Sequence, residues 1–281
     1  MTEWIETCRG TVVPWECDTT EHFTIAYYLD RVDQASATLA EHLGIEDHLH
    51  AGVFPRRFSL RFTRELRAGA SFHVTSAPLG LDPALRLGHR FIDSANGDTV
   101  TWIEEVWDAA LLTDTQSAAV VQNLANWEGP AAELRSDPRA TQGLISSARG
   151  RVRPTDLDTF GRFSLAGFVH RFADACIQSC AAIGMTDDYM KTERRGYSTF
   201  ELILRIDRAP GPGMPYLVET GIAHLGSSSI RFLHRLSDPE TAQELARLGQ
   251  FGVHLDLDAR RPAPLPEHVR ARAAQLLLPT G

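Results

Sequence analysis

The sequence predicts an α+β protein made of two tandem copies of one domain, each with a long helix packed against an antiparallel sheet. An internal repeat carries this prediction, because residues 9–44 and 149–184 agree without gaps at eleven of 36 positions, where chance gives about two. The segments at 64–69 and 85–93 also recur, at shifts of 141 and 145 residues. A slowly growing shift indicates a duplicated domain with small loop insertions, and a repeat of roughly 140 residues has the usual size of one domain.

The boundary between the copies is expected in the stretch "NWEGPAAELRSDPRATQG". We therefore predict a first domain at residues 1–130, a linker at 131–143 and a second domain at 144–281. The composition supports this division, since 281 residues with 43% hydrophobic and 23% charged residues are enough for two modest cores.

Each copy is expected to contain one strand, one long helix and then about four strands. In the first copy a β-type run at 7–15 and a loop precede a helix at 24–43, where apolar residues recur with a 3.6-residue period that Ser36 interrupts. Thr24 is the predicted N-cap of this helix and Gly44 its C-terminal cap. Alternation of apolar and polar residues predicts the strands, which lie at 57–66, 71–81, 85–93 and 100–108.

The second copy repeats this order of elements. Ser164 is the predicted N-cap of its long helix, Gly184 closes the helix, and Leu165, Val169 and Phe172 lie on the apolar stripe. Both copies therefore predict a two-layer domain in which one helix covers one curved sheet.

Charge and hydropathy exclude several functional classes. A net charge of −8 and a pI near 5.8 argue against a nucleic-acid partner, which requires a basic face. No apolar run approaches the roughly 20 residues of a membrane span, and the first ten residues lack the pattern of a secretion signal, so we expect a cytoplasmic protein. The four cysteines have no CxxC spacing, which predicts reduced thiols and neither a disulfide framework nor a metal site.

The loop that runs into each long helix resembles a motif of the hotdog-fold thioesterases of the 4-hydroxybenzoyl-CoA thioesterase type. "PWECDTTEHFTIAYYLDRVDQA" (14–35) is similar to the family pattern D-x-x-G-H-x-N-x-x-Y-Y, and "RPTDLDTFGRF" (153–163) is similar to the form found in double-hotdog acyl-ACP thioesterases. The resemblance implies two hotdog domains that pair through their sheets as a pseudo-dimer, with active sites between them. It also implies hydrolysis of an acyl thioester, of CoA or of a carrier protein, to a carboxylic acid and a free thiol.

Neither loop matches the family pattern completely. The first copy keeps Asp18 and His22 but has Glu21 where glycine is usual and Thr24 where asparagine is usual. Because this loop retains both an acid and a histidine, we expect the active site in the first copy.

The second loop departs from the pattern at a different position. It keeps Asp158 and Gly161 but has Arg162 in place of the histidine. Asp158 is the second candidate catalytic carboxylate, although loop aspartates often serve only to cap a helix or a turn.

These residue types suit thioester hydrolysis. Asp18 could attack the thioester directly or deprotonate a water molecule, and the sequence leaves both roles open. His22 is expected to support it by orienting the water or contacting the acyl group. Backbone amides at Thr24 and Ile25, at the start of the helix, are the predicted donors to the oxyanion.

Paired arginines lie at similar places in both copies and could bind the phosphates of CoA. They are Arg56, Arg57, Arg194 and Arg195. The expected partner is thus a small-molecule acyl thioester, with no cofactor and no metal, and the protein is expected as a monomer with an internal pseudo-dimer or as a homodimer.

Other polar positions have a simpler interpretation. His89 and His234 occupy matching strand positions, which indicates shared packing, and Asp33 and Asp174 on the helices are read as solvated or backbone-bonded residues. Two other functions stay open. A double-hotdog enoyl-thioester hydratase would carry a D-x-N-P-x-H element, which neither loop supplies, and the incomplete loops also fit a non-catalytic acyl-thioester binding protein.

Overall fold

The computed structural model describes residues 4–18, 20–108, 111–130 and 143–279. Within these residues the chain divides into two compact units, the first consisting chiefly of residues up to 130 and the second chiefly of residues from 143 onward. All but the last residue of the predicted linker at 131–143 falls outside the described residues, so the domain bounds stay a prediction. The predicted α+β class is confirmed, and each unit is described below by itself.

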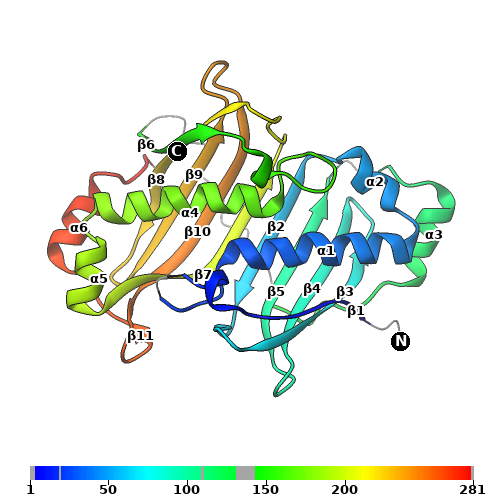
Figure 1. Ribbon diagram of the computed structural model, residues 1–281, viewed down its shortest axis with the longest axis horizontal. Coiled ribbons are helices and arrows are strands. Elements are labelled where there is room, and N and C mark those ends of the chain that lie inside the picture. Colours follow the sequence, from blue (N-terminus) through cyan, green and yellow to red (C-terminus); the bar gives the residue numbers. More distant parts are fainter. Residues whose placement is uncertain (1–3, 19, 109–110, 131–142, 280–281) are drawn as a thin grey trace. The chain divides into compact units, whose positions relative to one another are not determined.

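The first unit has the predicted order of strand, long helix and four strands, with additional short helices. Its elements are β1 (Ile5–Thr11), the 3₁₀ helix η1 (Pro14–Glu16), α1 (Ile25–Leu43), α2 (Glu46–Ala51), β2 (Arg56–Phe62), β3 (Ser71–Gly80), β4 (Leu85–Asp93), β5 (Thr99–Trp107) and α3 (Asp114–Gln122). The antiparallel strands follow the order β1-β3-β4-β5-β2. Helix α1 runs across one face of this sheet (Figure 1).

The second unit repeats the same topology. Its elements are β6 (Ile145–Arg151), η2 (Pro154–Asp156), α4 (Leu165–Ala182), α5 (Asp187–Glu193), β7 (Arg195–Ile206), β8 (Pro215–Leu225), β9 (Ser229–Ser237), β10 (Glu244–Asp256), β11 (Arg261–Pro262) and α6 (Glu267–Ala274). The strand order β6-β8-β9-β10-β7 matches that of the first unit position by position, with the short β11 paired to β10. Helix α4 lies across this sheet as α1 does across the first (Figure 1).

Helix α1 begins and ends where the capping residues predict. Thr24 has an extended backbone before the first turn, although its side chain makes no capping hydrogen bond. Gly44 adopts a left-handed conformation with φ of 66°, and its N–H donates to the carbonyls of Ala40 and Glu41. Burial then fixes which face of α1 meets the sheet, since Leu29 and Val32 are fully buried, each stabilising the fold by about 1.5–3 kcal/mol.

Ser36, which interrupts the apolar stripe, belongs to a buried polar network between α1 and the sheet. Its hydroxyl donates to Oε2 of Glu105 at 2.5 Å, and Nε2 of His89 lies 3.4 Å from the same oxygen. The guanidinium of Arg56 and the indole of Trp107 donate to Oε1 of Glu105. Glu105 is fully buried, so these donors replace the water that the carboxylate loses on folding.

Candidate functional site

Asp18 organises a tight loop between η1 and α1. Its Oδ1 accepts hydrogen bonds from the backbone N–H groups of Thr20 at 2.8 Å and His22 at 3.1 Å, and from the Thr20 hydroxyl at 2.6 Å. The Asp18 N–H in turn donates to the His22 carbonyl at 2.9 Å, which closes the loop. Asp18 is exposed, and within the described residues these three hydrogen bonds all reach Oδ1.

Glu21 occupies the strained position of the same loop. Its φ is 65°, in the left-handed region that favours glycine, and the equivalent Gly161 has a φ of 74°. The family pattern has glycine here, and the structure shows why. Glu21 keeps the loop conformation at the cost of backbone strain rather than changing it.

His22 connects this loop to the end of β2. Its Nε2 lies 2.8 Å from Oε2 of Glu65, and its Nδ1 lies 3.0 Å from the Thr20 hydroxyl. The Thr20 hydroxyl also lies 2.6 Å from Oδ1 of Asp18, so a continuous chain of polar contacts runs from Glu65 through His22 and Thr20 to Asp18.

Glu65 and Thr20 were not among the residues predicted from the sequence. The segment "RELRAG" matches "RIDRAPG" of the second copy, but Glu65 corresponds to Ile206 at the shift of 141 residues. The sequence signal for Glu65 is a charged residue at a position where the matching segment of the other copy has an apolar one. The neighbouring Leu66 ties this segment to the loop, because its carbonyl accepts from the Phe23 N–H at 2.8 Å.

One of the two predicted oxyanion donors already makes a hydrogen bond that anchors the loop. The Thr24 N–H donates to the Glu16 carbonyl at 2.9 Å, so the prediction that this amide is a free donor is wrong. Glu16 is itself buried and binds Arg31 of α1 at 2.6 Å. Ile25, the first residue of α1, has no acceptor within the helix by its position, and its role as an oxyanion donor stays a prediction.

The second loop has the same geometry, but Arg162 also donates to the second oxygen of its aspartate. Oδ1 of Asp158 accepts from the N–H groups of Phe160 and Arg162, both at 2.9 Å, and Oδ2 accepts from Nε of Arg162 at 3.1 Å. The Arg162 guanidinium also lies 4.7 Å from the Phe160 ring. Both oxygens of Asp158 are thus engaged, which is the arrangement expected of a structural aspartate.

The predicted phosphate-binding arginines are paired with carboxylates. Arg56 is buried and bound to Glu105 in the core, so its prediction as a CoA ligand is wrong. Arg57 lies 3.7 Å from Asp108. Arg194 and Arg195 lie 3.1 Å and 3.0 Å from aspartates of the β10 end, at positions 258 and 256. The three remaining arginines stay a prediction.

Neither a metal-binding cluster nor a membrane-spanning helix is found within the described residues. No cluster of three or more histidine, cysteine, aspartate or glutamate side chains there has the geometry to hold a metal ion. No helix in the same ranges has the length and hydropathy needed to cross a membrane.

The topology and the loop define a hotdog-type domain that occurs twice. Residues 152–273 match the family model described as the thioesterase-like superfamily. This match lies within the second copy, the half in which both oxygens of the loop aspartate accept hydrogen bonds.

Several solved structures of thioesterases share the fold of most of the chain. A putative oleoyl thioesterase from Lactobacillus plantarum is 13% identical, with a TM-score of 0.68 over 90% of this chain and 98% of its own. An acyl-ACP thioesterase from Bacteroides thetaiotaomicron is 11% identical, with a TM-score of 0.65 over 87% and 96% of the two chains. The 12:0-ACP thioesterase from Umbellularia californica is 12% identical, with a TM-score of 0.64 over 88% and 92%.

These structural matches confirm the double-hotdog fold. No curated protein sequence matches the chain.

Proposed function

We propose that the protein is an acyl-thioester hydrolase that acts on an acyl-CoA or an acyl carrier protein and uses Asp18 of the first domain. The observation that carries this proposal is the hydrogen-bonded chain from Glu65 through His22 and Thr20 to Oδ1 of Asp18. It holds Oδ1 of the exposed Asp18 in place. A carboxylate fixed in this way is ready to act without reorganisation during the reaction.

Asp18 then either attacks the thioester carbonyl or removes a proton from the attacking water. In both cases the thiolate leaves without needing a strong acid, because thiols have pKa values near 8 to 9. The Ile25 N–H at the start of α1 is the proposed donor to the oxyanion. His22 and Glu65 position the loop, and the reaction needs no cofactor.

Release of free thiol from a panel of acyl-CoA and acyl carrier protein substrates tests the proposed activity. We expect Asp18→Asn to lower kcat by about 100- to 10,000-fold. The matched control is Asp158→Asn, which makes the same substitution at the equivalent loop position of the second copy. It should leave kcat within about threefold. Equal losses in the two variants would contradict the assignment of the site to the first domain.

Single-turnover hydrolysis in water labelled with ¹⁸O separates the two roles of Asp18. A nucleophilic Asp18 forms a mixed anhydride with the acyl group, and water that attacks the Asp18 carbonyl of this anhydride leaves the label in the enzyme. A general base places the label only in the product acid, so label in Asp18 identifies the nucleophilic role.

Two other functions are outcomes of the same experiments. Hydration of an enoyl thioester without thiol release would favour the hydratase, and tight binding of acyl thioesters without turnover would favour the binding protein.

A further inference from the structure

Trp15 is an exposed aromatic residue next to the candidate catalytic loop of the first domain. It is the middle residue of η1, three positions before Asp18, and its side chain is 76% exposed. Within the described ranges its indole N–H makes no hydrogen bond and its rings make no aromatic contact. The indole therefore presents a flat apolar face and an unused donor to the solvent, the two features by which tryptophan binds ligands.

The turn that carries Trp15 is anchored to α1. The carboxylate of Glu16, the next residue, accepts from Arg31 of α1 at 2.6 Å, and the Glu16 carbonyl accepts from the Thr24 N–H at 2.9 Å. Glu16 itself is buried. The exposed indole is thus attached to an ordered turn, so little conformational entropy of the backbone is lost when it binds a ligand.

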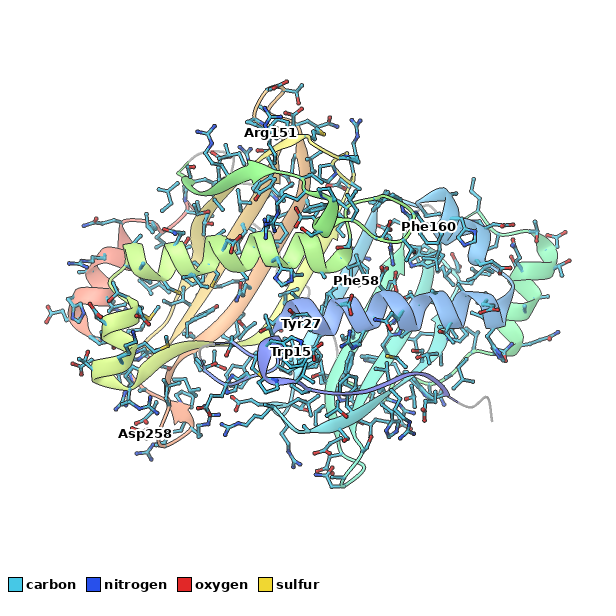
Figure 2. All side chains as sticks on the ribbon, in the orientation of Figure 1. Trp15, Tyr27, Phe58, Arg151, Phe160 and Asp258 are labelled. Carbon is cyan, nitrogen blue, oxygen red and sulfur yellow. The ribbon has the colours of Figure 1, made fainter. Side chains whose placement is uncertain are left out.

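Tyr27 is a second aromatic residue near the proposed oxyanion donor. It lies in the first turn of α1 and its ring stacks on Phe23, with centroids 6.2 Å apart and an angle of 16° between the planes. Trp15 and Tyr27 both lie near the N-terminal end of α1 (Figure 2). Two aromatic residues therefore lie near the helix end at which the reaction is proposed to occur.

The second copy has no aromatic residue at either position. At the shift of 140 residues Thr155 corresponds to Trp15 and Gly167 corresponds to Tyr27, whereas the buried Phe23 is matched by another phenylalanine. The fold of the loop and helix therefore does not require Trp15 or Tyr27. They occur in the copy that is proposed to carry out the reaction.

The spacing along the chain limits which part of a thioester substrate Trp15 can contact. Three residues span at most about 11 Å, so Trp15 is too close to Asp18 to contact the nucleotide at the far end of CoA. An acyl chain is bound by removal from water in a mostly apolar pocket, and Trp15 is exposed. The pantetheine arm, which CoA and carrier proteins share, combines two amide groups with short apolar segments, and these match the N–H and the face of an indole.

We propose that Trp15, together with Tyr27, binds the pantetheine arm of the acyl thioester. This inference rests on the proposed function. The arm lies against the indole face, and the indole N–H donates to one of its amide carbonyls. Because this part of the substrate does not react, the contact is the same in the ground state and in the transition state, and it contributes to binding rather than to the chemical step.

Steady-state kinetics of Trp15→Ala with the best acyl-CoA substrate test the proposal. We expect KM to rise about tenfold with kcat within about twofold. Trp15→Phe keeps a ring but loses the N–H donor, and it should raise KM by less. The matched control is Phe160→Ala, which removes an exposed aromatic side chain from the loop of the second domain and should leave KM within about twofold.

Iodide quenching of tryptophan fluorescence gives a measurement that needs no turnover. Trp15 is exposed, whereas the other four tryptophans are buried or half-buried, so iodide quenches mainly Trp15. We expect pantetheine to protect Trp15 from iodide. Adenosine 3′,5′-bisphosphate, which carries the nucleotide end of CoA without the arm, should not protect it.

The outcomes separate this inference from the proposed function. Thiol release that Asp18→Asn abolishes, combined with an unchanged KM in Trp15→Ala, would overturn the role of Trp15 and leave the hydrolase in place. Protection by pantetheine without thiol release from any substrate would overturn the hydrolase and support the binding of the arm. Equal protection by the nucleotide, or no protection by pantetheine, would also overturn the inference.

Discussion

Replacing Glu105 with glutamine isolates the energetic contribution of the buried charge in the first domain. The second domain carries Gln250 at this position, so the side chain fits the fold, but in the first domain the change leaves the Arg56 guanidinium buried without a counter-ion. Breaking a buried pair by removing one partner costs about 3–5 kcal/mol. With a urea m-value of about 2 kcal/mol/M, this lowers the unfolding midpoint of the first domain by roughly 2 M.

Tryptophan fluorescence measures this change for one domain, because the five tryptophans of the chain lie at positions 4, 15, 102, 107 and 127. The control is the double variant Glu105→Gln with Arg56→Met, which removes both charges, including the guanidinium whose carbon lies 5.1 Å and 5.6 Å from the ring centres of Phe58 and Trp107. Replacing both members of a buried pair is often close to neutral. We therefore expect the double variant to be more stable than the single one. A single variant that costs less than about 1 kcal/mol, or a double variant that is less stable still, would refute this account.

The pH dependence gives an independent check of the same charge. Burial raises the pKa of Glu105, but Arg56, together with His89 and Ser36, lowers it by more, so the pKa lies well below its ordinary value. A carboxylate with a depressed pKa in the folded state stabilises the protein above its unfolded pKa, and this stability is lost as the pH falls through the folded pKa. The difference in unfolding free energy between the parent and Glu105→Gln should thus be full at pH 7 and shrink progressively below about pH 4.5.

Four further substitutions test the two loops, the cap of α3 and Glu65. Glu21→Gly should stabilise the first domain by about 1 kcal/mol in urea unfolding, because it relieves the strain of a left-handed φ. Gly161→Ala should destabilise the second domain by a similar amount, measured by circular dichroism. Thr113→Ala should cost about 1 kcal/mol, since Thr113 and Gln116 form the capping box of α3; an unchanged midpoint would contradict this. Glu65→Gln should lower kcat while leaving KM within about twofold, because Glu65 positions His22 and does not touch substrate; a change in KM alone would assign Glu65 to binding instead.

The fold could be predicted because the repeat is visible both in the residue identities and in the order of the expected helices and strands. The bounds of α1 are fixed by Thr24 and Gly44, residues whose capping preference is local, and the strand at 85–93 matches β4. The predicted first strand at 7–15 extends too far, because Pro14 begins a 3₁₀ turn that ends the pairing at Thr11. The short helices α2, α3, α5 and α6 were not predicted, since six to nine residues carry too weak a periodicity to be recognised.

The candidate site was less predictable because its contacts join residues distant in the chain. Asp18 and His22 are close in sequence and were predicted together. Glu65 lies 43 residues beyond His22, and only the folded loop brings its carboxylate to Nε2. Arg56 was misassigned for the same reason: its sequence neighbourhood looks like a surface strand, whereas its actual partner, Glu105, lies on the adjacent strand β5.

Duplication explains why the two loops have diverged in opposite directions. Both domains need an aspartate whose Oδ1 closes the turn before the long helix, so this function constrains Asp18 and Asp158 equally. The second oxygen has no such structural task. In the second domain Nε of Arg162 donates a hydrogen bond to it, which stabilises the turn. In the first domain the residue at the equivalent position, His22, contacts Glu65 instead. Arg162→His should therefore remove the hydrogen bond to Oδ2 of Asp158. His22→Arg should abolish thiol release while preserving the fold of the loop.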